Sequence, residues 1–152
     1  MDDADAEVYR KHAASLVRLA ASLVGPSDAE DVLSSAVIRV MASRSWPTVE
    51  NKGGYLYRSV VNEARRFLSS RSSRERRELL WESPDRVYQP QISPEIQEAV
   101  ASLSARQRAV VFLTYWEDLD GATTADRLGI SEGSVRRHLD RARKALKGKI
   151  HV

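Results

Sequence analysis

The stretch LDGATTADRLGISEGSVRRHL, residues 119–139, decides the fold of the C-terminal part of the chain. Ala125 is small at the point where two helices would have to approach closely, and Gly129 can adopt the positive φ that a short turn between them requires. Ile130 and Val135 supply apolar side chains to fill the space between the helices. This spacing predicts a helix-turn-helix.

The second helix of this motif has one apolar side and one basic side. Ser131 is a residue type that caps helix starts, and an apolar stripe follows it at helical spacing. The stripe consists of Val135, Leu139, Ala142 and Leu146, which leaves Ser134, Arg136, Arg137, Asp140, Arg141 and Lys144 on the outer side. A buried stripe fixes which polar side chains can enter the major groove of DNA, so this layout is typical of a recognition helix. An ordinary amphipathic hairpin with a solvated basic side is the alternative.

Six side chains at this helix are the candidate DNA contacts. They are Ser131, Ser134, Arg136, Arg137, Arg141 and Lys144. Arginine can bond a guanine edge with two hydrogen bonds or neutralise a phosphate, and the pattern does not decide which arginine does which. We expect Arg141 and Lys144 to lie nearer the phosphate backbone than the others.

Helical periodicity also dominates the first seventy residues. Val8, His12, Leu16, Leu19 and Leu23 recur at steps of three and four residues, which predicts a first helix. Gly25-Pro26 ends this helix. Ser27 and Glu30 then have the spacing of a capping box, so a second helix is expected from about Asp28.

A loop and a third helix follow. Trp46-Pro47 disfavours helix and marks a break between Ser43 and Lys52, where the indole could be exposed. From about Gly54 a third helix is expected. Its inward residues are Leu56, Val60, Val61, Ala64, Phe67 and Leu68.

A change of composition divides the chain. Residues 80–92 contain prolines and no regular period, so we expect a flexible linker there. Ser93-Pro94-Glu95 is typical of a new helix start, and Ser104 with Gln107 has capping-box spacing. The predicted fold is all-α, with two small helical domains joined by this linker. The domains are residues 1–79 and 93–152.

The charges alternate along the chain although the formal net charge is only +3. Net charges of −3, +5, −3 and +4 belong to residues 1–50, 51–80, 81–103 and 104–152 in turn. Basic blocks attract polyanions, so two separate nucleic-acid contacts are one interpretation. Solvated faces of arginine-rich helices are the other.

Composition argues against several function classes. The chain has no cysteine, and its three histidines, His12, His138 and His151, lack the spacing of metal ligands. No glycine-rich phosphate loop is present, so we expect no catalytic site, no metal and no cofactor. The acidic start lacks the features of a signal peptide, and no apolar run approaches the length of a membrane span. We therefore expect a cytoplasmic protein that does not insert into membranes.

Three further stretches support a family assignment. They are DAEDVL at 28–33, YLYRSVVNEAR at 55–65 and LSARQRAV at 103–110. In this order the chain resembles the extracytoplasmic-function sigma factors, the smallest members of the sigma-70 superfamily. The first stretch is similar to that family's region 2 signature, the second to the later part of region 2, and the third to the opening of region 4. Each stretch alone is weak evidence, whereas their combination across a linker is specific.

The resemblance implies roles for these parts. Region 4 would recognise the promoter −35 element through the six candidates named above. The later part of region 2 would open and recognise the −10 element, with candidates Trp46, Lys52, Tyr55, Tyr57, Arg58, Asn62, Arg65 and Arg66. The candidates for docking on the β′ clamp helices of core RNA polymerase are Asp28, Glu30, Asp31 and Leu33. The polymerase β flap and an anti-sigma protein are further implied partners.

The region 2 assignments have structural alternatives. Opening a duplex without ATP needs binding energy that favours unpaired bases, supplied by pockets or by stacking on aromatic rings. The aromatic candidates can instead serve core packing. Glu30 and Asp31 can instead stabilise the positive end of the second helix.

The chain departs from the family pattern at three places. Thr123-Thr124 replaces a usual Glu-Ile, Ser34-Ser35 replaces a common Gln-Glu, and His138-Leu139-Asp140 varies a more basic face. These departures bear on promoter sequence and partners more than on class. Two other functions remain open at this point: a stand-alone helix-turn-helix regulator that binds operators as a dimer, and an RNA-processing or nucleotide-handling enzyme.

Overall fold

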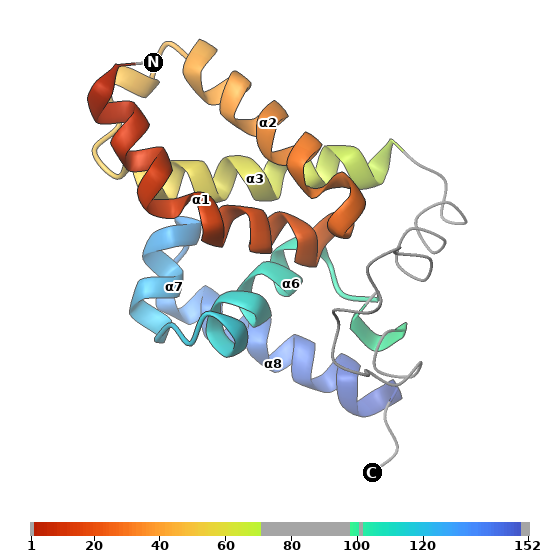
Figure 1. Cartoon of the computed structure of the whole chain (residues 1–152). Coiled ribbons are helices and arrows are strands. Elements are labelled where there is room, and N and C mark those ends of the chain that lie inside the picture. Colours follow the sequence, from red (N-terminus) through yellow and green to blue (C-terminus); the bar gives the residue numbers. More distant parts are fainter. Residues whose placement is uncertain (1, 71–97, 101, 150–152) are drawn as a thin grey trace.

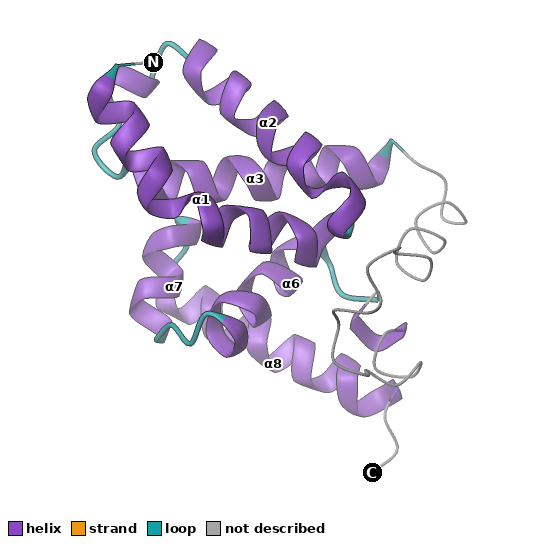
Figure 2. Cartoon of the chain, viewed as in Figure 1, coloured by secondary structure: helices purple, strands orange, loops and turns teal. Residues whose placement is uncertain are grey.

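The computed structural model describes residues 2–70, 98–100 and 102–149, and its regular elements there are all helices (Figure 2). The N-terminal half, residues 2–70, contains α1 (Asp3–Val24), α2 (Pro26–Ala42), the 3-10 helix η1 (Trp46–Thr48) and α3 (Lys52–Ser69). The C-terminal half, residues 102–149, contains α6 (Ala105–Val111), the π-helical turn η3 (Phe112–Trp116), α7 (Gly121–Leu128) and α8 (Glu132–Lys149). The all-α prediction is confirmed. The predicted linker at 80–92 and the helix start at Ser93-Pro94-Glu95 lie outside the described residues.

The N-terminal half is a bundle in which α1, α2 and α3 each pack against the other two. Leu16, Leu19 and Leu23 are fully buried on one side of α1, as the periodicity predicts. The inward residues predicted for α3 are buried as well, except that Phe67 is half-buried. The sequence pattern thus places the apolar sides of α1 and α3 correctly.

The junction of α1 and α2 corrects one prediction. Gly25 takes a φ of 91° at the end of α1, a conformation that favours glycine, and Pro26 occupies the first turn of α2. Proline suits this position because its fixed φ is helical and its missing N–H would have no partner in the helix. The predicted capping box at Ser27 and Glu30 is therefore wrong, because both residues already lie inside the helix.

The loop before α3 corrects a second expectation. Trp46 is only 4% exposed and belongs to the apolar core, so the indole is not presented to solvent. Asn51 caps α3, its side-chain oxygen accepting a hydrogen bond of 2.9 Å from the Gly54 N–H. The helix begins at Lys52, slightly earlier than predicted, because this cap precedes the two glycines.

The C-terminal half contains the predicted helix-turn-helix. Ser104 and Gln107 form the predicted capping box at the start of α6. Gly129 ends α7 with a φ of 66°, and Ser131 caps α8 by accepting a hydrogen bond of 3.0 Å from the Ser134 N–H. Val135 is buried against the core, as the motif requires.

The two halves pack on one another. In Figure 1, α6 and α7 lie between the N-terminal bundle and α8. α7 contacts α3, and α6 contacts both α1 and α3. Buried apolar side chains of both halves form one continuous core. The sequence patterns do not show how the two halves sit relative to each other.

Candidate nucleic-acid interface

The exposed side of α8 carries the predicted recognition residues. Val135 and Ala142 are buried toward the core, whereas Arg136, Arg137 and Arg141 are exposed. The helix therefore presents its arginines to solvent, on the side away from its buried stripe. The sequence-predicted recognition face is confirmed as a surface, and its contact with DNA stays a prediction.

The start of α8 is ordered by a chain of hydrogen bonds. The Ser131 hydroxyl donates to the Ser134 hydroxyl at 3.1 Å, and the Arg137 Nη2 donates to the same Ser134 oxygen at 2.8 Å. The cap thus positions one guanidinium at the N-terminal end of the helix, where recognition helices contact base edges. One turn before the helix end, Lys144 pairs with Asp140 at 3.3 Å. This exposed pair leaves Lys144 free to exchange partners at little cost.

α3 brings together some of the −10 candidates along one side. Tyr55, Asn62 and Arg66 line a hollow of about 160 Å³ between α2 and α3, together with Ser59 and Arg39. The Tyr55 hydroxyl lies 3.4 Å from the Ser43 and Ser45 hydroxyls, and these two hydrogen bonds lower the pKa of Tyr55. The Arg58 guanidinium lies over the Tyr55 ring, 5.8 Å from its centre. A polar hollow with an aromatic wall and flanking cations suits an unpaired base and its phosphate.

Other −10 candidates are engaged elsewhere. Lys52 forms an ion pair of 3.6 Å with Asp5 and lies 5.2 Å from the centre of the Trp46 ring. The Trp46 indole N–H is the largest cause of the lowered pKa of the Asp5 carboxyl, and Lys52 adds to it. Tyr57 is fully buried. For Trp46 and Tyr57 the structure supports the core-packing alternative. The side chain of Arg65, by contrast, is exposed to solvent.

Glu63 is a residue that the sequence analysis missed. Its carboxylate lies 2.9 Å from the Arg39 Nε and 3.7 Å from the Arg66 Nε. Both arginines line the 160 Å³ hollow and a neighbouring one of about 310 Å³. Glu63 therefore fixes two cations at the mouth of the candidate site, and only its helical spacing from Arg66 could have indicated this.

The candidate polymerase-docking residues divide into two groups. Glu30 and Asp31 are exposed near the start of α2, whereas Leu33 is buried in the core. Leu33 is therefore not available for a direct contact in this conformation.

Ile38, on the outer side of α2, is 69% exposed and was not predicted. An apolar residue outside the inward stripe of a helix was the signal that could have identified it.

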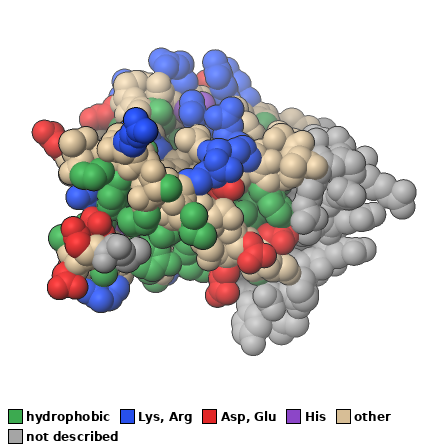
Figure 3. All heavy atoms as spheres, turned by 90° about the horizontal axis from the view of Figure 1, so that it is seen from above, with side chains coloured by type: hydrophobic (Ala, Val, Ile, Leu, Met, Phe, Trp, Pro, Cys, Tyr) green, Lys and Arg blue, Asp and Glu red, His purple; other side chains and the backbone are tan. Residues whose placement is uncertain are grey.

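The surface view separates residue types. In Figure 3, Lys and Arg side chains gather in the upper part of the visible face, and hydrophobic side chains are exposed in its middle.

In the part of the chain that the structure describes, no group of His, Asp and Glu is arranged as a metal site, and no helix has the length and apolarity to cross a membrane.

Two family models match the chain, one to each half. Residues 8–74 match Sigma-70 region 2, and residues 93–146 match Sigma-70, region 4. The RNA polymerase sigma-E factor of Streptomyces coelicolor is 34% identical over 143 residues, which cover 90% of this chain and 80% of that protein. The chain belongs to the extracytoplasmic-function group of the sigma-70 family. The predicted resemblance is thereby confirmed.

Further relatives agree with this assignment. The ECF RNA polymerase sigma factor SigL of Mycobacterium tuberculosis is 31% identical over 159 residues, covering 92% of this chain and 85% of that protein. The sigma factor RpoE of Bartonella quintana, solved in complex with the anti-sigma factor NepR, has the same fold with a TM-score of 0.59, 21% identity and 92% coverage of both chains. The protein is thus an alternative sigma factor for transcription initiation. Sigma factors as a family are not enzymes, and a stand-alone operator-binding regulator no longer fits.

Proposed function

We propose that this sigma factor directs core RNA polymerase to its promoters through two DNA contacts, one on α8 and one on α3. The exposed arginine face of α8, fixed by the Ser131 cap and the buried Val135, is the observation that carries the proposal. The −35 contacts are Ser131, Ser134, Arg136, Arg137, Arg141 and Lys144. The planar guanidinium of arginine can form two hydrogen bonds with a guanine edge, and the ammonium group of Lys144 can neutralise a phosphate.

The −10 contact is the hollow beside Tyr55. A base that leaves the duplex loses its stacking interactions with neighbouring bases. Stacking on an aromatic side chain such as Tyr55 compensates for part of this loss. Asn62 lies at the hollow and offers both a donor and an acceptor to a base edge. Arg66, held by Glu63, and the exposed Arg65 neutralise the displaced strand, and Arg58 joins them where it is accessible. Trp46, Lys52 and Tyr57 support this surface from beneath rather than contact DNA.

The contact with core polymerase lies on α2. Asp28, Glu30 and Asp31 form its acidic end, and Ile38 provides an exposed apolar anchor on the same helix. Acidic groups beside an exposed apolar side chain suit a basic partner surface with an apolar centre. On this view Leu33 supports the helix from the core, the clamp helices of β′ bind α2, and the β flap binds the C-terminal half.

The cellular setting follows from this role. We propose that the protein works in the cytoplasm beside the polymerase, catalyses no reaction of its own and needs no cofactor. The RpoE relative of known structure is bound to an anti-sigma factor, which supports the proposal of such a partner for this chain too.

Run-off transcription tests the proposed function. Purified core polymerase, the full chain and a genomic promoter pool are combined, and core polymerase alone serves as the control. We expect discrete transcripts that depend on the chain. The proposal is wrong if no initiating complex forms while the chain alone binds DNA operators cleanly.

A further inference from the structure

Gly133 is the second residue of α8, on the exposed side that carries the proposed −35 contacts. It lies two residues before the buried Val135, and two residues turn an α-helix by about 200°, so Gly133 is on the opposite side. Arg137 and Lys144 follow it on that outer side, at spacings of four and eleven residues. The N-terminal end of the proposed −35 surface therefore has a residue without a side chain at its centre.

The backbone conformation does not require a glycine at this position. Where the structure is described, positive φ at glycine occurs at Gly25 and Gly129, and not at Gly133. Alanine favours helix over glycine, because glycine loses more conformational freedom on folding. The glycine therefore costs stability without allowing a backbone conformation that alanine could not adopt.

Packing within the C-terminal half does not require the glycine either. A Cβ at Gly129 would collide with the Arg58 guanidinium, so that position has no room for a side chain. A Cβ at Gly133 would instead lie at least 3.7 Å from its nearest neighbours, which is ordinary van der Waals contact. The free chain thus has room for a methyl group at Gly133.

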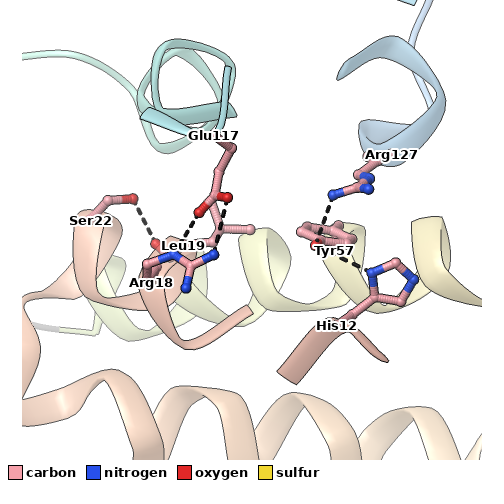
Figure 4. Close-up of polar contacts among 7 residues, drawn as sticks. All are labelled: His12, Arg18, Leu19, Ser22, Tyr57, Glu117 and Arg127. Carbon is pink, nitrogen blue, oxygen red and sulfur yellow. Dashed lines mark hydrogen bonds and ion pairs between the residues drawn. The ribbon is translucent and has the colours of Figure 1, made fainter. Parts of the chain in front are cut away.

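The contacts of α8 with the rest of the protein lie elsewhere as well. Its buried side packs against α6 and α7. Polar contacts to the N-terminal half come from neighbouring segments, where Glu117 pairs with Arg18 at 2.7 Å and Arg127 donates to the Tyr57 hydroxyl at 3.1 Å (Figure 4). Gly133 takes part in neither set, because it lies on the outer side of the helix.

Polar groups surround the space over Gly133. A Cβ there would lie 3.7 Å from Arg136 Nη2 and from Ser131 Oγ, and 3.8 Å from Arg137 Nη1. Arg137 is held in this orientation, because its Nη2 donates to the Ser134 hydroxyl at 2.8 Å. Two guanidinium groups therefore border the same space, and their like charges repel each other. An acceptor from another molecule in this space would relieve the repulsion.

We infer that Gly133 is a specificity-determining residue, whose missing side chain lets a guanine edge of the −35 element approach the α8 backbone between Arg136 and Arg137. The inference rests on the proposed function and deepens it. Glycine is a common residue where a backbone comes close to a ligand, and the N-terminal residues of a recognition helix contact base edges. Guanine fits this space because its O6 and N7 accept the two hydrogen bonds that an arginine can donate.

Two alanine substitutions in the same helix test the inference. Gly133→Ala is expected to raise the folding equilibrium constant of the free chain about two- to fivefold in urea unfolding. In the complex with core polymerase, it is expected to weaken binding to promoter DNA about fivefold to a hundredfold, the range for loss of one base contact. Gly148→Ala is the matched control, because a Cβ there would meet no described atom within 4 Å. It should leave promoter binding unchanged.

A base analogue identifies the contacted atom. Each guanine of the −35 element is replaced in turn by 7-deazaguanine, which lacks the N7 acceptor. The wild-type complex should lose affinity at one of these positions or more. The Gly133→Ala complex should lose less at the same position, because the contact is already absent. The salt dependence of its binding should equal that of the wild type, because the phosphate contacts remain.

The outcomes separate this inference from the proposed function. If changes in the −35 element do not affect the wild-type complex, both are wrong. If the wild type depends on that element and Gly133→Ala binds the promoter equally tightly, only the role of Gly133 is wrong. Lower stability of Gly133→Ala would overturn the inference, because the fold itself would then require the glycine. Uniform weakening across all −35 variants with a shallower salt dependence would also overturn it, because a phosphate would then occupy this space.

Discussion

The two proposed DNA surfaces differ in how freely they are presented. The arginine face of α8 is exposed, and its order comes from neighbours in sequence, Ser131 and Ser134. The α3 surface is partly covered, because α7 lies on Tyr57 and Arg58. The proposed −35 surface is thus exposed, whereas part of the proposed −10 surface is covered by the C-terminal half. Recognition of intact duplex and opening of it therefore make different demands on the same small protein.

The α8 face should show the largest effect. Replacing Arg136 and Arg137 with alanine is expected to weaken −35 binding by about 1–3 kcal/mol for each base that an arginine bonds in the wild type, because that base edge is left without its bidentate partner. The measurement is binding of the polymerase complex to promoter DNA at several salt concentrations. Arg10→Ala, an exposed arginine of α1, is the control and should leave binding unchanged. Unchanged promoter choice and salt dependence in the double variant would remove α8 from the DNA interface.

The α3 hollow should matter only when the duplex has to open. Tyr55→Ala is expected to cost about 1–3 kcal/mol in open-complex formation, the range for loss of one base stacked on an aromatic ring. Transcription from a template with a preformed bubble should be affected less than transcription from duplex. Tyr55→Phe, which retains the ring, serves as the matched control. An equal defect on both templates would argue against a role in opening.

The buried cation between the halves allows a comparison within one helix. Arg108→Ala removes the donor to the Leu23 carbonyl and should lower the free energy of unfolding by about 1–3 kcal/mol, the usual cost of an unsatisfied buried group. Arg106→Ala, an exposed position of α6, should stay within about 0.5 kcal/mol of wild type. Urea unfolding measures both. Equal effects would mean that the Arg108 hydrogen bond contributes nothing specific.

Replacing Thr124 is expected to give a small gain in stability. Its side chain is fully buried, and its hydroxyl has no hydrogen-bond partner within the described residues, at a position where the family pattern has isoleucine. Thr124→Val keeps the shape and removes the unpaired hydroxyl, so stability should rise by about 1 kcal/mol. Thr123→Val, at a half-buried position, is the control and should give little or no gain. A loss of stability in Thr124→Val would show that the hydroxyl is satisfied in solution.

The sequence predicts features that depend on near neighbours. The helix-turn-helix follows from Gly129, Ser131 and Val135, and the capping box at Ser104 from a spacing of three residues. The same local logic fails at Ser27, because Pro26 has a stronger preference for the first turn. It also fails for Trp46, since an aromatic residue beside a proline can belong to a loop or a core, and only tertiary packing, here of η1 against α2, decides which.

Interactions between distant residues lie beyond such patterns. Arg18 and Glu117 are 99 positions apart, and Arg108 and Leu23 are 85 apart. An arginine in a basic segment is predicted to be exposed, so burial of Arg108 has no local signal. The covering of part of the proposed −10 surface could not be predicted for the same reason, because it depends on how the halves pack.

Footprinting of promoter DNA tests the central claim most directly, with permanganate detection of unpaired thymines in the same sample. With core polymerase present, the chain is expected to protect both the −35 and −10 elements and to make thymines reactive only around −10. Alone, it should protect neither element strongly. Strong protection of a symmetric site by the chain without polymerase, and no reactive thymines with it, would contradict the account.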